Sequence, residues 1–158
     1  MPSSTSKRDE SIARVSDTVR DFMAQAVLFQ DAVARFGGLN STDLQTVSIL
    51  ISQGPATPGE LAERTGLTAG GAITAVVDRL EKAGYATRAR DETDRRRVIV
   101  TANFDTVMAR VGPIYGRVGQ RWTDYIETLT DEQIEFANEL FARATEINRE
   151  EIAHLREG

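Results

Sequence analysis

Apolar side chains recur at alternating intervals of three and four residues along the N-terminal part of the chain. The stripe consists of Ile12, Val15, Val19, Phe22, Ala26, Phe29, Val33 and Phe36. This spacing predicts one long helix over residues 12–36, ended by Gly37-Gly38. A helix of about 25 residues is longer than one small core requires, so we expect part of its stripe to meet a second chain.

The C-terminal region has the same spacing of apolar residues in two further stretches. The first runs from Phe104 to Leu129, and Gly112-Pro113 should break or kink it because proline removes a backbone donor. Thr130 and Gln133 form a capping box that predicts a last helix. Its stripe consists of Ile134, Ala137, Phe141, Ala144, Asn148, Ile152 and Leu155.

The terminal helices are therefore predicted to form a homodimer. We assign residues 9–38 and 102–158 to this helical dimerisation region, preceded by a disordered lead of residues 1–8. The side chains expected at the dimer interface are Ile12, Val15, Val19, Phe22, Phe141, Ile152 and Leu155.

The middle of the chain is built from shorter elements. Ser41 is expected to cap a helix through about Ser52, with an apolar face of Leu44, Val47, Ile49, Leu50 and Ile51. A second helix follows in "TPGELAERTG". In that stretch Thr57 is the expected N-cap, Pro58 the first helical residue, Glu60 the capping-box acid and Gly66 the stop.

A third helix is expected to begin after a cap at Thr68 and to end at Gly84. Two short helices joined by a tight turn with glycine are typical of a helix-turn-helix. The runs "YATRAR" and "RRVIVT" flank "DETD" and predict a β-hairpin. The expected fold is therefore mainly α with a small β-hairpin wing, a winged helix-turn-helix over residues 39–101 between long dimerisation helices.

Composition excludes several classes of protein. The 158 residues include no cysteine and one histidine, His154, so disulfides, thiolate metal sites and His- or Cys-dependent catalysis have no support. Scattered carboxylates are the remaining argument for an enzyme. No apolar run approaches a membrane span or a signal peptide. We expect a cytoplasmic protein without a cofactor or metal and not an enzyme.

Charge is distributed unevenly along the chain. The net charge is −5, yet residues 79–97 carry seven basic and four acidic side chains, and five arginines fall between Arg88 and Arg97. An isolated charge run of this kind is usually a solvated hairpin tip. Placed on the wing of a helix-turn-helix, a basic patch on an acidic body favours a polyanionic partner.

The order and spacing of these pieces resemble the MarR (multiple-antibiotic-resistance regulator) family of winged-helix transcription factors. The resemblance rests on "ELAERTGLT", "GAIT", "VVDRLEKAGY" and "DETDRRRVIVT". It implies a homodimer that binds double-stranded DNA, typically as a repressor released by a small organic ligand. It also implies that Arg95 and Arg96 contact the DNA backbone and minor groove, and that the helix after Thr68 enters the major groove.

The predicted recognition helix has an unusually plain outward face. With Ile73, Val76, Val77 and Leu80 directed inward, the outward positions are Thr68, Gly71, Ala75, Asp78, Arg79 and Lys82. No Arg, Asn or Gln on its first two turns can form a bidentate base contact. Ala75 stands where the family often has a basic or polar residue, although alanine can touch a thymine methyl. The DNA-contact candidates in and before this helix are Thr57, Thr68, Ala69, Gly70, Gly71, Thr74, Ala75 and Arg79.

The wing should therefore supply many of the contacts that hold DNA. We expect Asp94 to hold an arginine or a turn amide while Arg95 or Arg96 reaches an A·T-rich minor groove. The other three wing arginines are expected near phosphates or paired with Asp91 and Glu92. They are Arg88, Arg90 and Arg97.

Two points stay open from the sequence. A small aromatic or phenolic effector would lie between the dimer helices and the winged helix, with Phe22, Phe29, Tyr115 and Trp122 as candidate lining; ordinary core is the other interpretation of each and the commoner one for such side chains. The alternative to DNA binding is a winged helix used for protein–protein contact.

Overall fold

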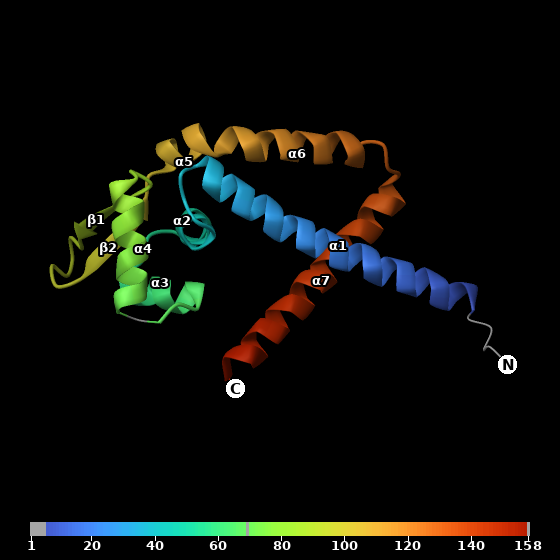
Figure 1. The fold of residues 1–158 in the computed structure, drawn as a ribbon, viewed down its shortest axis with the longest axis horizontal. Coiled ribbons are helices and arrows are strands. Elements are labelled where there is room, and N and C mark those ends of the chain that lie inside the picture. The colour runs from blue at the N-terminus through green and yellow to red at the C-terminus, as the bar shows by residue number, and fades with distance from the viewer. Residues whose placement is uncertain (1–5, 69, 158) are drawn as a thin grey trace. The chain divides into compact units, whose positions relative to one another are not determined.

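The computed structural model of the chain describes residues 6–68 and 70–157. They divide into two compact units, the first ending at Pro113 and the second beginning at Ile114. The first unit contains the long helix α1 and a winged helix at one end of it (Figure 1). The second unit contains most of α6 and all of α7.

Helix α1 spans Lys7–Phe36 and ends at Gly37, as the glycine pair predicts. It begins earlier than the stripe indicates, because Ser6 and Asp9 form a capping box that satisfies amides of the first turn. The expected disordered lead is therefore wrong for residues 6–8. The rest of that lead, residues 1–5, lies outside the described residues.

Helix α2 spans Ser41–Gln53, but its N-cap is Asn40 and not Ser41. The Asn40 Oδ1 accepts the Asp43 amide at 2.8 Å, while the Ser41 hydroxyl donates to the Asp31 carboxylate at 2.8 Å. Asparagine and serine cap helices about equally well, so with Asn40 and Ser41 side by side the sequence does not decide which of them is the N-cap. The expected apolar face is buried at Leu44, Val47 and Leu50. The expectation is wrong for Ile51, which is 39% exposed.

Helix α3 (Pro58–Thr65) has the capping box between Thr57 and Glu60 and the left-handed Gly66 stop that the sequence predicts. Helix α4 (Gly71–Lys82) begins two residues later than a cap at Thr68 predicts. Its N-cap is Gly70 at φ +105°, a conformation that favours glycine, and Thr68 does not cap it. The prediction failed because threonine is a common N-cap, whereas Gly70 and Gly71, the N-cap and first residue of the helix, carry no side chain that marks its start.

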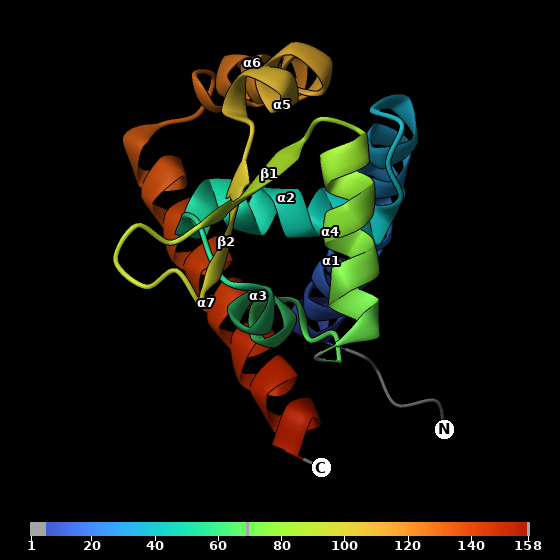
Figure 2. The ribbon, with the colours of Figure 1, turned by 90° about the vertical axis from the view of Figure 1, so that its left-hand side faces the viewer.

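The hairpin consists of β1 (Ala86–Arg90) and β2 (Val98–Ala102), antiparallel with Arg88 opposite Val100. Ala56 adds an isolated bridge to Val100, which ties the segment before α3 to the sheet. The hairpin turn extends away from α2 and α4 (Figure 2). Helix-turn-helix and hairpin together form the expected winged helix.

The core lies in this first unit, between α1, α2, α3, α4 and the sheet. Tyr85, between α4 and β1, is fully buried, and its hydroxyl donates to the Gly37 carbonyl at 2.7 Å. The buried apolar side chains are Val33, Ala34, Leu39, Leu44, Val47, Leu50, Ala56, Leu61, Ala62, Ile73, Val76, Val77, Leu80, Tyr85, Ala86, Val100 and Val111.

Three more helices follow the hairpin. Helix α5 (Phe104–Arg110) ends before Gly112-Pro113, and α6 (Gly112–Ile126) starts there, so the expected break is confirmed. Helix α7 (Asp131–Glu157) begins with the predicted capping box of Thr130 and Gln133. None of the helices in the described part of the chain has the length and apolar content that a membrane span requires.

Candidate nucleic-acid interface

The exposed face of α4 is set by the side chains that the helix buries. Ile73, Val76, Val77 and Leu80 are buried as predicted. At 100° per residue, Gly71, Ala75, Asp78 and Lys82 then point away from the core. All four are exposed, so this line of α4 is accessible to a ligand.

The start of α4 is open and has no side-chain cap. A Cβ added at Gly70 or Gly71 would meet nothing within 4 Å, so neither glycine is required by packing within the described chain. The Thr74 hydroxyl donates to the Gly70 carbonyl at 2.9 Å, which leaves its oxygen as an acceptor only. The free amides of this first turn and the helix dipole favour a phosphate.

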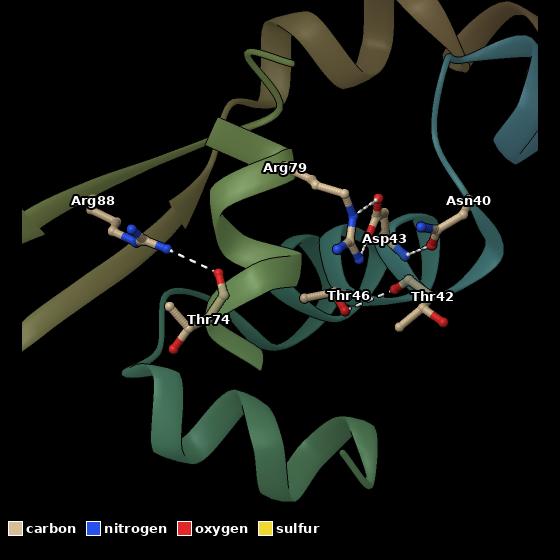
Figure 3. Close-up of polar contacts among 7 residues, drawn as sticks. All are labelled: Asn40, Thr42, Asp43, Thr46, Thr74, Arg79 and Arg88. Carbon is tan, nitrogen blue, oxygen red and sulfur yellow. Dashed lines mark hydrogen bonds and ion pairs between the residues drawn. The ribbon is translucent and has the colours of Figure 1, made fainter. Parts of the chain in front are cut away.

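Arg79 makes a bidentate pair with Asp43 of α2 (Figure 3). Its Nε and Nη2 donate to the two carboxylate oxygens at 3.0 and 2.7 Å. The Asp43 side chain is only 4% exposed, and its hydrogen bonds raise the pKa of Arg79. This geometry holds α4 against α2 and directs the Arg79 fork away from the outward line.

Arg88 of β1 reaches α4 from the opposite flank (Figure 3). Its Nη2 donates to Asp78 Oδ1 at 2.5 Å and to the Thr74 carbonyl at 3.4 Å, and its Nη1 lies 3.5 Å from Glu81 Oε2. The expected pairing of Arg88 with Asp91 or Glu92 is therefore wrong. Those acids are adjacent in sequence, but the twist and alternation of the strand direct Arg88 to the helix.

Two aspartates hold the turn of the wing. Asp91 Oδ1 accepts the Thr93 hydroxyl, the Thr93 amide and the Asp94 amide at 2.6, 2.7 and 3.2 Å. Hydrogen bonds from the Thr93 side chain and backbone hold the pKa of Asp91 below its ordinary value. Asp94 Oδ1 accepts the Arg96 amide at 3.0 Å, so the expectation that Asp94 holds a turn amide is confirmed.

The arginines of the turn differ in what they contact. Arg90 donates to the Arg95 carbonyl at 2.9 Å, and Arg97 lies 3.3 Å from Glu60 Oε1. Neither forms the expected ion pair with Asp91 or Glu92, although the positive charge of Arg97 helps to keep the pKa of Asp91 low. The exposed guanidinium groups of Arg95 and Arg96 have no hydrogen bond or ion pair to any residue that the structure describes. They are therefore available to an external anion.

Glu60 connects the wing to α3. Its carboxylate accepts the Thr57 amide at 2.7 Å and contacts Arg97, while the Thr57 hydroxyl accepts the Glu60 amide at 3.2 Å. The Thr57 amide is the main reason why the pKa of Glu60 is lowered. Because a hydroxyl that accepts can still donate, Thr57 keeps one donor for a phosphate.

The remaining predicted positions are spread over several parts of the chain. Thr68 is exposed in the turn before α4, and Ala69 lies outside the described residues. Phe22 and Phe29 lie on α1 of the first unit, and Tyr115 and Trp122 lie on α6 of the second, where a shallow hollow is lined by Val118, Arg121, Trp122 and Tyr125. A common effector site stays a prediction.

The side chains expected at a dimer interface are exposed. The values range from 43% at Val19 to 78% at Leu155. The exposed fractions of the other five side chains lie between these two values; they are Ile12, Val15, Phe22, Phe141 and Ile152. Their pairing with a second chain stays a prediction as well.

The acids that pair with the arginines of this surface were not assigned to them from the sequence. Asp43, Asp78 and Glu60 fix three of the arginines, over separations of 36, 10 and 37 residues. The periodicity of the sequence predicts on which face of a helix or strand a charged residue lies. It does not predict which residue of another element that side chain will contact after folding. The one available signal was Asp43 at the third residue of α2, a position at which an acid is common.

Known proteins are similar to this chain in sequence and in architecture. A model of the MarR family matches residues 37–97. YcgE of Bacillus subtilis, an HTH-type transcriptional regulator, is 34% identical over 155 residues, which cover 98% of this chain and 99% of YcgE. The chain belongs to the MarR family of transcriptional regulators.

Solved structures of similar fold extend over most of this MarR-family chain. Streptococcus pneumoniae FabT, in a complex with DNA, has a TM-score of 0.68 at 17% identity and covers 88% of this chain and 98% of its own. A MarR family protein from Bacillus stearothermophilus has a TM-score of 0.65 at 19% identity, covering 95% and 99%. These likenesses confirm the winged-helix fold of the family.

Proposed function

We propose that this MarR-family regulator binds double-stranded DNA as a homodimer, with α4 in the major groove and the wing arginines in or beside the minor groove. One observation carries the proposal. Arg95 and Arg96 stand exposed on a turn that two aspartates hold, and neither guanidinium has a partner among the described residues. The crystal structure of FabT, a protein of the same fold, in complex with DNA supports the same conclusion.

The wing supplies most of the attraction in this proposal. The outward line of α4 offers Gly71 and Ala75 and no long donor on its first two turns. Arginines in a narrow A·T-rich minor groove respond to groove width and potential more than to a base code. We therefore expect modest major-groove discrimination and an affinity that falls steeply as salt is raised.

Homodimerisation is supported by the exposed apolar stripes. No residue of α7 from Asp131 to Arg156 is buried within the described chain, and its apolar side chains Ile152 and Leu155 are 51% and 78% exposed. A helix of 27 residues with such a stripe is unlike a helix that faces solvent. A two-fold dimer predicts an inverted-repeat operator with half-sites roughly 10 base pairs apart.

Repression, with release by a small aromatic or phenolic ligand, completes the proposal. The family resemblance supports it, and the aromatic side chains of α1 and α6 are the candidate lining. The chain has no cysteine, so release by thiol oxidation within it is excluded.

The alternative is a winged helix that binds another protein. The small, weakly polar face of Gly71 and Ala75 favours it, whereas the wing arginines do not. Selection of fragments bound from the source genome, followed by gel shifts at two salt concentrations, separates the two. DNA binding predicts a recovered inverted repeat, a mass of two chains per site and a strong salt dependence. Absence of any enriched sequence, with binding no tighter than to random DNA, would contradict the proposal.

A further inference from the structure

The DNA-facing helix carries two acidic side chains that would repel a phosphate backbone. Asp78 belongs to the outward line of α4, and Glu81 lies one turn further on the flank that faces the hairpin. Their side chains are 57% and 43% exposed. Placed within a Debye length of a phosphate, an uncompensated carboxylate lowers DNA affinity.

Arg88 is the cation that faces both acids. Its Nη2 is committed to Asp78 at 2.5 Å and to the Thr74 carbonyl at 3.4 Å, and its Nη1 lies 3.5 Å from Glu81. Both ends of the guanidinium fork are therefore directed at α4. The side chain is only 27% exposed, the least of the arginines in the ion pairs described above.

We propose that Arg88 is a positioning residue that serves as an internal counter-ion of the recognition helix. It neutralises Asp78 and Glu81 and joins β1 to α4, so its effect on DNA affinity passes through these carboxylates and not through a phosphate contact. This inference rests on the proposed function, because it concerns how the same surface accepts DNA. Arg88, which the sequence predicted near a phosphate or an acid of the turn, is thus assigned to two acids of α4 instead.

Arg90 provides a matched comparison on the same strand. It lies two residues further along β1, so both side chains belong to the same face of the hairpin. Its guanidinium donates to a backbone carbonyl at the turn and not to an acid on α4. Loss of Arg90 therefore removes a positive charge near DNA without exposing a carboxylate on the recognition helix.

The test is a double-mutant cycle on DNA affinity. Arg88→Gln, the pair Asp78→Asn with Glu81→Gln, and the triple variant are titrated against a labelled duplex recovered from a random-sequence pool by the parent protein. Arg88→Gln should weaken binding on the order of tenfold in the parent background and by less than about twofold in the background lacking both acids. Arg90→Gln should have the same effect in both backgrounds.

Each outcome decides the matter. Equal losses for Arg88→Gln in the two backgrounds would identify a direct phosphate contact and overturn the inference, while leaving DNA binding intact. Failure of the parent protein to select any duplex would instead refute the proposed function. Dimer mass and thermal unfolding of every variant show whether it is folded. If Arg88→Gln is unfolded, Arg88→Met, which keeps a long side chain but removes the charge, replaces it in the cycle with the same criterion.

Discussion

The hydroxyl of Tyr85 donates a hydrogen bond of 2.7 Å to the backbone carbonyl of Gly37, inside the core of the first unit. This bond joins the end of α1 to the residue between α4 and β1, 48 positions away. Arg110 covers the Tyr85 ring, with its guanidinium carbon 5.1 Å from the ring centroid. The corner after the long helix is thereby fixed to the winged helix.

Gly37 should not tolerate a side chain at this corner. An added Cβ would lie 2.8 Å from Val111 Cγ1 and 2.9 Å from the Tyr85 hydroxyl. We expect Gly37→Ala to lower the free energy of unfolding by about 1–3 kcal/mol, measured by urea denaturation at fixed protein concentration. Gly59→Ala, at an open position within α3, should instead be neutral or raise it by up to about 1 kcal/mol. Equal stability of the two variants would refute the close approach.

The pair of Asp43 and Arg79 should contribute to stability because its carboxylate is buried. Asp43→Asn removes the charge that accepts both guanidinium hydrogen bonds. We expect this substitution to lower the free energy of unfolding by about 1–3 kcal/mol in denaturation experiments. The loss is not larger because Arg79 is half-exposed, so water can solvate its guanidinium when the pair is broken. Asp17→Asn breaks an ion pair whose two side chains are 74% and 70% exposed, and should cost less than about 1 kcal/mol. A similar small loss at both sites would contradict a structural role for Asp43.

Asp91 should support DNA binding by holding the wing turn. Asp91→Asn weakens three hydrogen bonds at the turn, although it also removes a negative charge near DNA. Glu92→Gln removes the same charge from the next residue and is the matched control. In fluorescence titrations we expect Asp91→Asn to bind several-fold more weakly than Glu92→Gln, because the tip loses its order. Equal affinities would mean that the turn does not depend on Asp91.

The same carboxylate should make the wing sensitive to acid. The pKa of Asp91 is held below its ordinary value of 3.8, so the folded turn favours the ionised form. Its contribution is therefore fully present above pH 3.8 and is lost as the pH falls through the lower folded value. Amide chemical shifts of Thr93 and Asp94 should report a midpoint below 3.8. A midpoint above this value would contradict the hydrogen bonds assigned to the turn.

Local signals in the sequence predicted the elements well where they are unambiguous. Thr57 with Glu60, Thr130 with Gln133, and the break at Gly112-Pro113 all follow from chemistry within a few residues. The cap of α2 and the start of α4 were misplaced because neighbouring residues offer equivalent caps or turns. Such boundaries depend on tertiary context that local preference does not specify.

The arginine partners could not be predicted in the same way. The sequence predicted Arg88 and Arg97 near phosphates or paired with acids of the turn, whereas folding brings them to Asp78 and Glu60 of two different helices. Proximity along the chain is a poor guide once a strand alternates its faces. What the sequence did indicate is the exposed arginine pair on the wing, and its contact with DNA is the central claim.

Arg96→Ala tests that claim most directly. Titration of parent, Arg96→Ala and Arg20→Ala against the selected duplex compares the wing tip with an exposed arginine of α1 that loses the same charge. We predict that Arg96→Ala weakens binding tenfold or more, about 1.4 kcal/mol, with an intact dimer and a shallower salt dependence. Arg20→Ala should bind like the parent. Unchanged affinity of a dimeric Arg96→Ala protein would contradict the wing's role in holding DNA.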